Sequence, residues 1–182
     1  ATSEAGYKNL TKLSSLSYLK NKETTDPSCS LEDLIDNNED LIILTGNYTN
    51  FFGKLFYKNK VKDIQQILSS LKNAFSDRIY IEIQRHNEFQ EKNFENYLLN
   101  ISVSLQIPLI ASQEIFYLNE DMHEAHDALV CIGEKNFVDD KDRFKYSNHH
   151  YFKSEEELKK MYSDIPEALE NNYNFHLRFN FK

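Results

Sequence analysis

The sequence predicts an α/β fold built from parallel strand–helix units, and three observations lead to this prediction. Short apolar runs bounded by turn residues occur three times, at 41–45, 78–84 and 108–112. Segments with apolar residues at helical spacing separate these runs. The length of 182 residues is enough for one domain with a buried core. Both an open doubly wound sheet and a barrel satisfy this alternation, and both collect chemistry at the carboxyl ends of the strands.

Two helices are predicted ahead of the first strand. Apolar residues recur at spacings of three from Tyr7 to Leu19 and define one helix face. A polar loop is predicted at Thr24–Ser30. Ser30 is placed to cap a short second helix, because Asp33 stands at the third helical position, as in a capping box.

The strands and their connecting helices follow one another without a break. Each connecting segment carries an apolar stripe at helical spacing. The predicted order is a strand at 41–45 ended by Gly46, a helix at about 61–75, a strand at 78–84, a helix at about 89–105 and a strand at 108–112.

The remainder of the chain is predicted to be helical, apart from a charged loop at 137–151. Asn119 opens a helix whose acidic first turn suits the positive end of the helix dipole. Ser154 and Glu157 form a second capping box.

The C-terminal segment suggests a chain that continues elsewhere. Asp164 is expected to cap a last helix at 165–175, with Pro166 in the first turn, where a missing N–H is tolerated. Residues 175–182 then alternate apolar and polar side chains, as an entering strand would. No initiator methionine opens the chain. We therefore expect a fragment of a longer protein.

Composition excludes several classes of protein. The net charge of −8 offers no basic surplus for nucleic-acid binding by this segment alone. The two cysteines, Cys29 and Cys131, stand far apart, which argues against a disulfide framework and a zinc ribbon. No apolar run is long enough to span a bilayer and no signal peptide opens the chain. We expect a cytoplasmic protein with no membrane association.

The strand at 78–84 carries the first candidate site. Glu82, Gln84 and His86 share parity and face away from the isoleucines of the same strand, toward a lumen or crevice. Glu82 and His86 on one inward face are candidate metal ligands or an acid–base pair. The alternative is a buried structural carboxylate that is hydrogen-bonded to its neighbours, with His86 in the loop.

Glu114 and Phe116, just past the strand at 108–112, are the second candidate site. Residues two apart on an extended segment point the same way and can offer two ligands to one metal. Phenylalanine cannot ligate a metal, so this pair suggests a site with one ligand missing. A polar strand end followed by an aromatic core residue is the alternative.

Further histidines carry weaker signals. His123 and His126 are three residues apart in one predicted helix and could meet at a metal, although separate packing roles account for them more simply. His149 and His150 lie together in a polar loop. No phosphate-binding loop, nucleophile elbow or HExxH motif is present.

Taken in order, several segments of the chain resemble the PHP (polymerase and histidinol phosphatase) domain of the α subunit of bacterial DNA polymerase III. The order of the whole set makes the resemblance specific. The segments are Gly6–Leu10 with Leu13–Ser15, Leu41–Gly46, Ile81–His86, Pro108–Ser112, Tyr117–Leu118, Ala125–Asp127 with Cys131–Ile132, Tyr151–Ser154 with Glu157, and Asp164–Asn171.

The resemblance implies a distorted βα-barrel of PHP type, incomplete at its N-terminal side, with a helical C-terminal part. Residues 1–170 would be the C-terminal two-thirds of the PHP domain, and 171–182 the start of the connection to the polymerase palm. The family's His-x-His motif would lie upstream of Ala1, and the catalytic carboxylates of the palm would lie downstream of Lys182. No catalytic residue of the polymerase is then expected in this chain.

The resemblance also assigns the two candidate sites to one metal centre. His86 matches the family histidine that follows the glutamate-bearing strand. Glu114-Ile115-Phe116 aligns with an Asp-x-His motif, in which Phe116 replaces the nitrogen ligand. His86 and Glu114 are therefore expected to be vestigial ligands, with Glu82, Gln84 and Phe116 as the other inward-facing residues. Zinc or manganese is not expected to bind, because the remaining ligands do not complete the geometry.

The function implied is that of a structural and partner-docking platform in a replicative DNA polymerase. The expected partners are the proofreading exonuclease subunit and other replicase subunits, with DNA contacted through the rest of the parent protein. Mg²⁺ would serve the parent polymerase, and the fragment alone would be inactive. Two alternatives remain, an active metal-dependent phosphoesterase or 3′–5′ exonuclease that uses His86 and Glu114, and an unrelated α/β binding domain.

Overall fold

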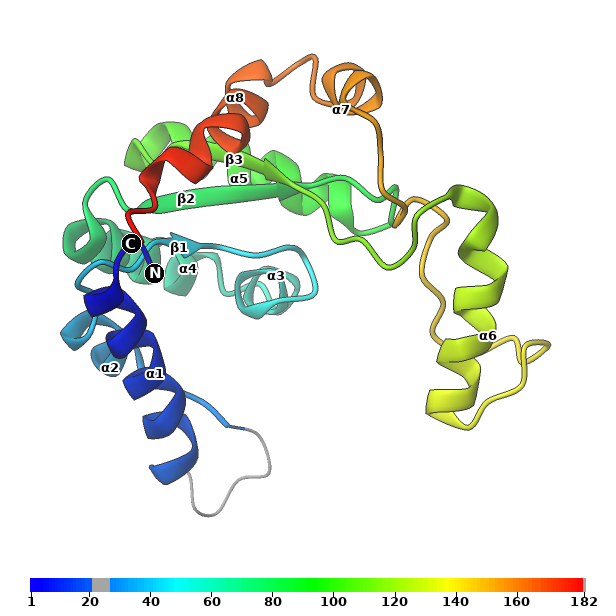
Figure 1. The fold of residues 1–182 in the computed structure, drawn as a ribbon, viewed down its shortest axis with the longest axis horizontal. Coiled ribbons are helices and arrows are strands. Elements are labelled where there is room, and N and C mark those ends of the chain that lie inside the picture. The colour runs from blue at the N-terminus through cyan, green and yellow to red at the C-terminus, as the bar shows by residue number, and fades with distance from the viewer. Residues whose placement is uncertain (21–26, 182) are drawn as a thin grey trace.

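A computed structural model describes residues 1–20 and 27–181, and a small parallel sheet lies at its centre (Figure 1). The sheet is formed by β1 (Ile43–Leu44), β2 (Ile79–Gln84) and β3 (Leu109–Ser112), in that spatial order. Both neighbouring pairs are parallel. These strands confirm the predicted α/β class and the parallel units. The described residues form a sheet of three strands, so closure into a barrel stays a prediction.

Helices connect the strands and cover the sheet. The elements are α1 (Glu4–Leu19), α2 (Leu31–Asp36), α3 (Phe51–Tyr57), α4 (Val61–Phe75), α5 (Glu91–Leu105), α6 (His123–Glu134), α7 (Glu155–Met161) and α8 (Pro166–Phe175), with 3₁₀ turns η1 (Glu120–Met122) and η2 (His176–Arg178). The predicted helices at 61–75 and 89–105 are confirmed as α4 and α5. The sequence did not predict α3, because seven residues are too short to display a helical period. Among the described residues, no helix has both the length and the apolar character needed to cross a membrane.

Both predicted capping boxes are present. The Ser30 hydroxyl accepts a hydrogen bond from the Asp33 N–H (3.1 Å), and the Asp33 carboxylate accepts one from the Ser30 N–H (3.3 Å). Ser154 and Glu157 repeat the arrangement at the start of α7. Reciprocal caps satisfy backbone donors at the first turn, so the starts of both helices follow from local sequence. Of the loop predicted at Thr24–Ser30, residues 24–26 lie outside the described residues.

Three expectations about helix ends are wrong. Asp164 does not cap α8, which Ile165 precedes without a side-chain cap, because the Asp164 carboxylate is instead paired with Arg85 (2.7 Å). Residues 176–178 form a 3₁₀ turn rather than a strand, and Arg178 there donates to the Tyr80 hydroxyl (2.7 Å). Asn119 opens the turn η1, and α6 begins four residues later. In the first two cases, an ion pair with a residue distant in sequence accompanies the observed arrangement, Asp164 with Arg85 and Arg178 with Asp77 (2.7 Å).

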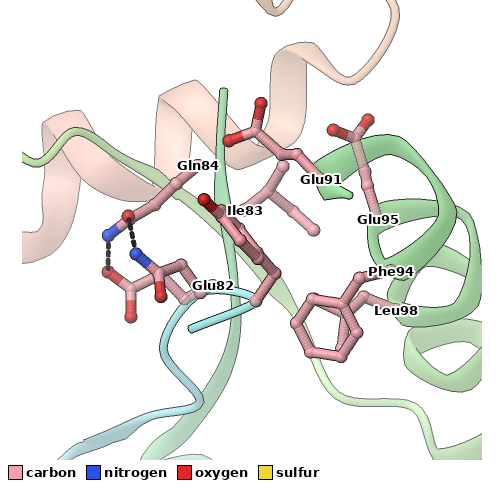
Figure 2. Close-up of a pocket in the computed structure, with 9 residues that line it drawn as sticks. Glu82, Ile83, Gln84, Glu91, Phe94, Glu95 and Leu98 are labelled. Atoms are coloured by element: carbon pink, nitrogen blue, oxygen red, sulfur yellow. Dashed lines mark hydrogen bonds between the residues drawn. The ribbon is translucent and has the colours of Figure 1, made fainter. Parts of the chain in front are cut away.

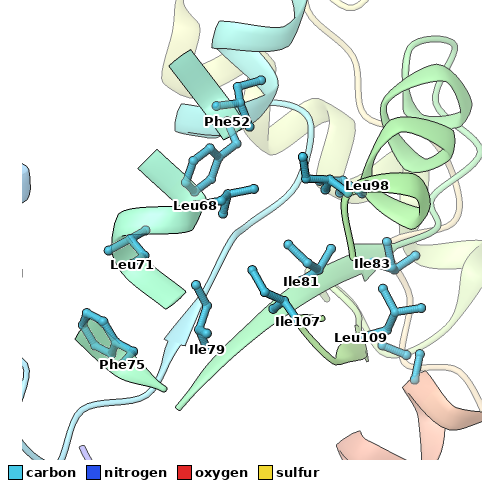
Figure 3. Packing of buried hydrophobic residues seen from close by; sticks show 14 of the residues in the cluster. Phe52, Leu68, Leu71, Phe75, Ile79, Ile81, Ile83, Leu98, Ile107 and Leu109 are labelled. Atoms are coloured by element: carbon cyan, nitrogen blue, oxygen red, sulfur yellow. The ribbon is translucent and has the colours of Figure 1, made fainter. Parts of the chain in front are cut away.

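The hydrophobic core lies on one face of the sheet, between the strands and the helices α4 and α5 (Figure 3). Ile79, Ile81 and Ile83 alternate along β2 and are almost fully buried in this core. Full burial of each such side chain contributes about 1.5–3 kcal/mol. The opposite face of β2 carries Tyr80, Glu82 and Gln84. The period of two therefore separates an apolar core face from a face that becomes polar toward the carboxyl end.

Helix α6 stands apart from the sheet at the end of two extended connections (Figure 1). The connections run side by side, since the Phe116 N–H donates to the His150 carbonyl (2.9 Å) and the Phe152 N–H to the Tyr117 carbonyl (3.0 Å). Tyr117 and Tyr151 form an isolated parallel bridge between them. We call residues 114–151 the α6 arm. The two chain ends lie together on the other side of the molecule, where the Asn180 N–H donates to the Thr2 carbonyl (2.8 Å).

Candidate functional site

The carboxyl ends of the strands meet around a buried carboxylate, Glu82. Its Oε2 accepts a hydrogen bond from the Gly46 N–H (3.0 Å), and its Oε1 accepts from Gln84 Nε2 (3.1 Å) and the Ser112 hydroxyl (2.5 Å). Figure 2 shows the bond between Gln84 and Glu82, and Gln84 in turn accepts from Asn47 Nδ2 (3.0 Å). Both oxygens of Glu82 are thus engaged by donors from neighbouring strand ends, which is the arrangement of a structural carboxylate.

A small cavity lies beside this network, on the side of α5 (Figure 2). Gln84 and Glu82 line it together with Glu91 and Phe94, and its volume is about 10 Å³. A volume of this size holds about one water molecule. The cavity is therefore too small for an organic substrate.

His86 follows β2 and is fully buried, with both ring nitrogens committed to neighbours. Nε2 accepts a hydrogen bond from the Glu114 N–H (3.1 Å), so the lone pair of this nitrogen is in use. Nδ1 lies 3.5 Å from Oε1 of Glu91, whose carboxylate also accepts the His86 N–H (2.8 Å). Because Nε2 accepts an N–H, the ring proton lies on Nδ1, on the side of Glu91.

Glu114 contributes its main chain to this site rather than its carboxylate. Besides donating its N–H to His86, it accepts a hydrogen bond from His150 Nδ1 at its carbonyl (3.2 Å). Its side chain is 43% exposed, and Oε2 lies 3.8 Å from His150 Nδ1. The structure brings the predicted pair His86 and Glu114 together, but the direct contact is made by a peptide group that any residue can provide.

A row of aromatic rings continues from His86 into the α6 arm. The His86 and His150 rings stack with centroids 4.0 Å apart and an interplanar angle of 3°. Phe116 lies 5.1 Å from His150 and 5.0 Å from His126, stacked in both cases, and Tyr146 lies 4.6 Å from Phe116. Each such pair contributes about 0.5–1.5 kcal/mol beyond area burial. The ring of Phe116 therefore occupies the middle of a row that ties the end of β2 to α6.

His150 lies between His86 and Phe116 in this row, and little in the sequence indicated that it belongs to the site. Burial lowers the pKa of His150 to about 4, and the neighbouring His86 adds to the shift. The imidazole is therefore neutral at pH 7. Among the described residues Nε2 has no hydrogen-bond partner, and it lies 3.8 Å from Glu88 Oε1. The only sequence signal for His150 was a histidine pair in a polar loop, which indicates neither burial nor a partner.

The two helical histidines have separate roles in packing. His123 Nε2 is hydrogen-bonded to the Tyr146 carbonyl (2.9 Å). His126 stacks on Phe116, as described above, and its ring also lies 5.4 Å from that of Tyr117. These contacts do not bring ring nitrogens of His123 and His126 together at one metal position.

The residues at the strand ends do not fit a metal centre of the kind that the family resemblance implies. The Nε2 lone pair of His86 is taken by an N–H group, Phe116 has no donor atom, and the Glu114 carboxylate is half-exposed, 3.8 Å from His150 Nδ1. Within residues 1–20 and 27–181, no group of three or more His, Cys, Asp or Glu side chains is arranged to hold a metal ion. A multinuclear site needs several convergent ligands with free lone pairs, and these residues do not supply them.

Comparison with known proteins identifies the family. Residues 1–86 match the model of the PHP domain. The chain is 33% identical over 171 residues to the DNA polymerase III subunit alpha of Caulobacter vibrioides (strain NA1000 / CB15N), a match that covers 94% of this chain. It is 36% identical over 174 residues to the subunit of the same name from Rickettsia bellii (strain RML369-C), and 36% identical over 178 residues to that of Rickettsia prowazekii (strain Madrid E).

These matches cover 96% and 98% of the chain in the two Rickettsia proteins. The chain spans about 15% of the length of each of the three relatives. The comparisons confirm the resemblance that the ordered sequence segments indicated. The chain therefore contains a PHP-domain segment and is similar, over almost its whole length, to part of the bacterial DNA polymerase III α subunits.

Proposed function

We propose that this chain is a structural and partner-docking platform in the α subunit of a bacterial replicative DNA polymerase, with a metal site that has degraded. One observation carries this proposal: Phe116 stands in a row of rings at the strand ends, and the Glu114 N–H uses the lone pair of His86. Where residues at ligand positions pack against one another instead of binding a metal, the site becomes rigid but cannot activate water.

The contacts around the row support a bracing role. The Glu88 carboxylate accepts a hydrogen bond from the Ser147 N–H (2.9 Å), and the Ser147 hydroxyl donates to the His86 carbonyl (2.5 Å). These bonds join residues about 60 positions apart in the chain. In this proposal they hold the α6 arm against the end of β2, as ligands shared through a metal would do in a metal-binding relative.

The parent protein supplies the chemistry in this proposal. Templated DNA synthesis, with Mg²⁺, takes place in parts that correspond to the rest of the α subunit, and this segment contributes no catalytic residue. The proofreading exonuclease subunit and other replicase subunits are the proposed partners, and the cytoplasm is the proposed location. The net charge of −8 supports contact with DNA through other parts of the parent protein.

The alternative is an active metal-dependent phosphoesterase or 3′–5′ exonuclease that uses His86 and Glu114. The two proposals differ in metal content and in the role of His86. We would purify the full-length protein without chelators, measure bound zinc and manganese by mass spectrometry, and assay hydrolysis of single-stranded DNA and of a nitrophenyl phosphodiester. His86→Ala would be compared with His176→Ala, which changes an exposed histidine outside the site.

We expect substoichiometric zinc and manganese, and no hydrolysis that depends on His86. Stoichiometric metal, together with hydrolysis that His86→Ala abolishes and His176→Ala preserves, would overturn the platform proposal in favour of the hydrolase.

A further inference from the structure

The outer face of α6 is apolar, and its inner face mixes polar side chains with the buried Cys131. Inward, His126 stacks on Phe116 and the buried Asp127 is paired with Arg143 through two bonds of 2.6 Å. Outward, Leu129 is 64% exposed and Ile132 is 76% exposed. The solvent-facing side of a surface helix in a soluble protein is normally polar. The apolar outer face of α6 therefore indicates a contact surface.

The apolar surface has a regular geometry and continues past the helix. Ala125, Leu129 and Ile132 follow one another at the i, i+4, i+7 spacing and form one stripe. Phe137 (79% exposed) and Val138 (54% exposed) come just after the end of the helix. We call these five residues the α6 face.

The loop that carries the end of the α6 face is held in place. The Arg143 side chain donates to the Val138 carbonyl from both Nε (3.2 Å) and Nη2 (3.1 Å). The Phe137 N–H donates to the Asp140 carboxylate (2.8 Å). The exposure of Phe137 and Val138 therefore belongs to an ordered loop, and α6 itself stands clear of the sheet (Figure 1).

The surroundings of the α6 face are strongly acidic. Apart from Glu134, which acts on the inward-packed Tyr146, the exposed carboxylates of residues 120–142 belong to Glu120, Asp121, Glu124, Asp139, Asp140 and Asp142. The exposed lysines are Lys135, Lys141 and Lys145, and the last lies 3.7 Å from Asp127. An acidic rim repels phosphate backbones and anionic lipids, and it also repels a second copy of the same face. It favours a partner with a basic rim.

We infer that the α6 face docks a protein segment that has an apolar centre and a rim rich in lysine or arginine. This inference rests on the proposed platform role and names the surface and the chemistry of the partner. The apolar centre would cover the stripe around Leu129, and the basic rim would face carboxylates such as Glu124 and Asp139. Interfaces commonly combine a desolvated apolar centre with complementary charges around it.

Site-specific photo-crosslinking in cells that contain the full-length protein tests this inference. A photoreactive amino acid would replace Ile132, and the crosslinked peptide would be mapped by mass spectrometry. The control position is Val103 on α5, which is 81% exposed and lies outside the α6 face. We expect one defined adduct at position 132, on a segment with apolar residues and net positive charge. Leu129→Ser should lower its yield about tenfold, and Glu124→Lys should also lower it.

Three results would overturn the inference: no adduct above the level seen at position 103, an adduct to α6 of a second copy, or an adduct to an acidic segment. Leu129 is mostly exposed, so its replacement by serine should leave the melting temperature unchanged and the crosslink yield interpretable. The metal and hydrolysis assays test the platform role separately. A failed crosslink leaves those assays untouched, and hydrolase activity with a positive crosslink would remove the platform role alone.

Discussion

Replacing Phe116 by alanine should loosen the α6 arm, because this ring links His126 of α6 to the buried imidazole of His150 at the base of the arm. Phe116 is 38% exposed, so about three-fifths of its surface is buried. For a phenylalanine of about 200 Å² and about 25 cal/mol per Å², that burial contributes about 3 kcal/mol. The stacking with His126 and His150 disappears as well. We therefore expect Phe116→Ala to destabilise the arm by about 3 kcal/mol.

Hydrogen exchange measures this loss where it should occur. The Phe152 N–H, which donates to the Tyr117 carbonyl, closes the base of the arm and should exchange about a hundredfold faster in Phe116→Ala. Phe89→Ala is the matched control, since Phe89 is 98% exposed and its loss should change little. If the two variants exchange at the same rate at Phe152, the row of rings does not hold the arm and the reasoning fails.

Two further predictions concern neighbours of this ring. The pKa of His150 is about 4 in the folded protein and 6.5 ordinarily, so the unfolded chain binds the proton more readily. The stability that the neutral ring contributes is therefore complete above about pH 6.5 and declines toward pH 4. Urea midpoints should therefore fall less on acidification in His150→Asn than in the parent, and parallel losses would contradict this. Glu114→Ala should change the free energy of unfolding by less than about 0.5 kcal/mol, because Glu114 holds His86 and His150 through its peptide groups. A large loss in urea titrations would mean that the carboxylate itself stabilises the site.

Local sequence patterns predicted most of the secondary structure. The alternation of isoleucines located β2, and a long apolar stripe located α4 with both of its ends. The predictions failed where a segment is too short to show a periodic pattern, or where a side chain binds a residue distant in sequence instead of its neighbours. Helix α3 has too few residues for a period, and Asp164 is paired with Arg85 instead of capping α8. Local rules do not contain such partners, since Arg85 is 79 residues away.

The sequence predicted where the candidate site lies, but only some of the residues that form it. Parallel strands end at one edge, so His86 and Glu114 were expected to lie together, and they do. His150 and Tyr146 reach the same place from a loop more than 30 residues further along. A polar loop has no periodic pattern from which burial can be inferred, so the sequence did not predict that His150 and Tyr146 belong to the site.

By itself, the sequence determined the parallel strand–helix architecture and the resemblance to the PHP domain, because both depend on residue type and spacing along the chain. Only the tertiary structure decided which atoms meet at the strand ends. It assigns the lone pair of His86 to a peptide N–H, places the Glu114 carboxylate 3.8 Å from His150 Nδ1 and stacks His150 between two other rings. Hydrogen bonds and ring contacts act through space over a few ångströms, and only the fold sets those distances between residues that are far apart in sequence.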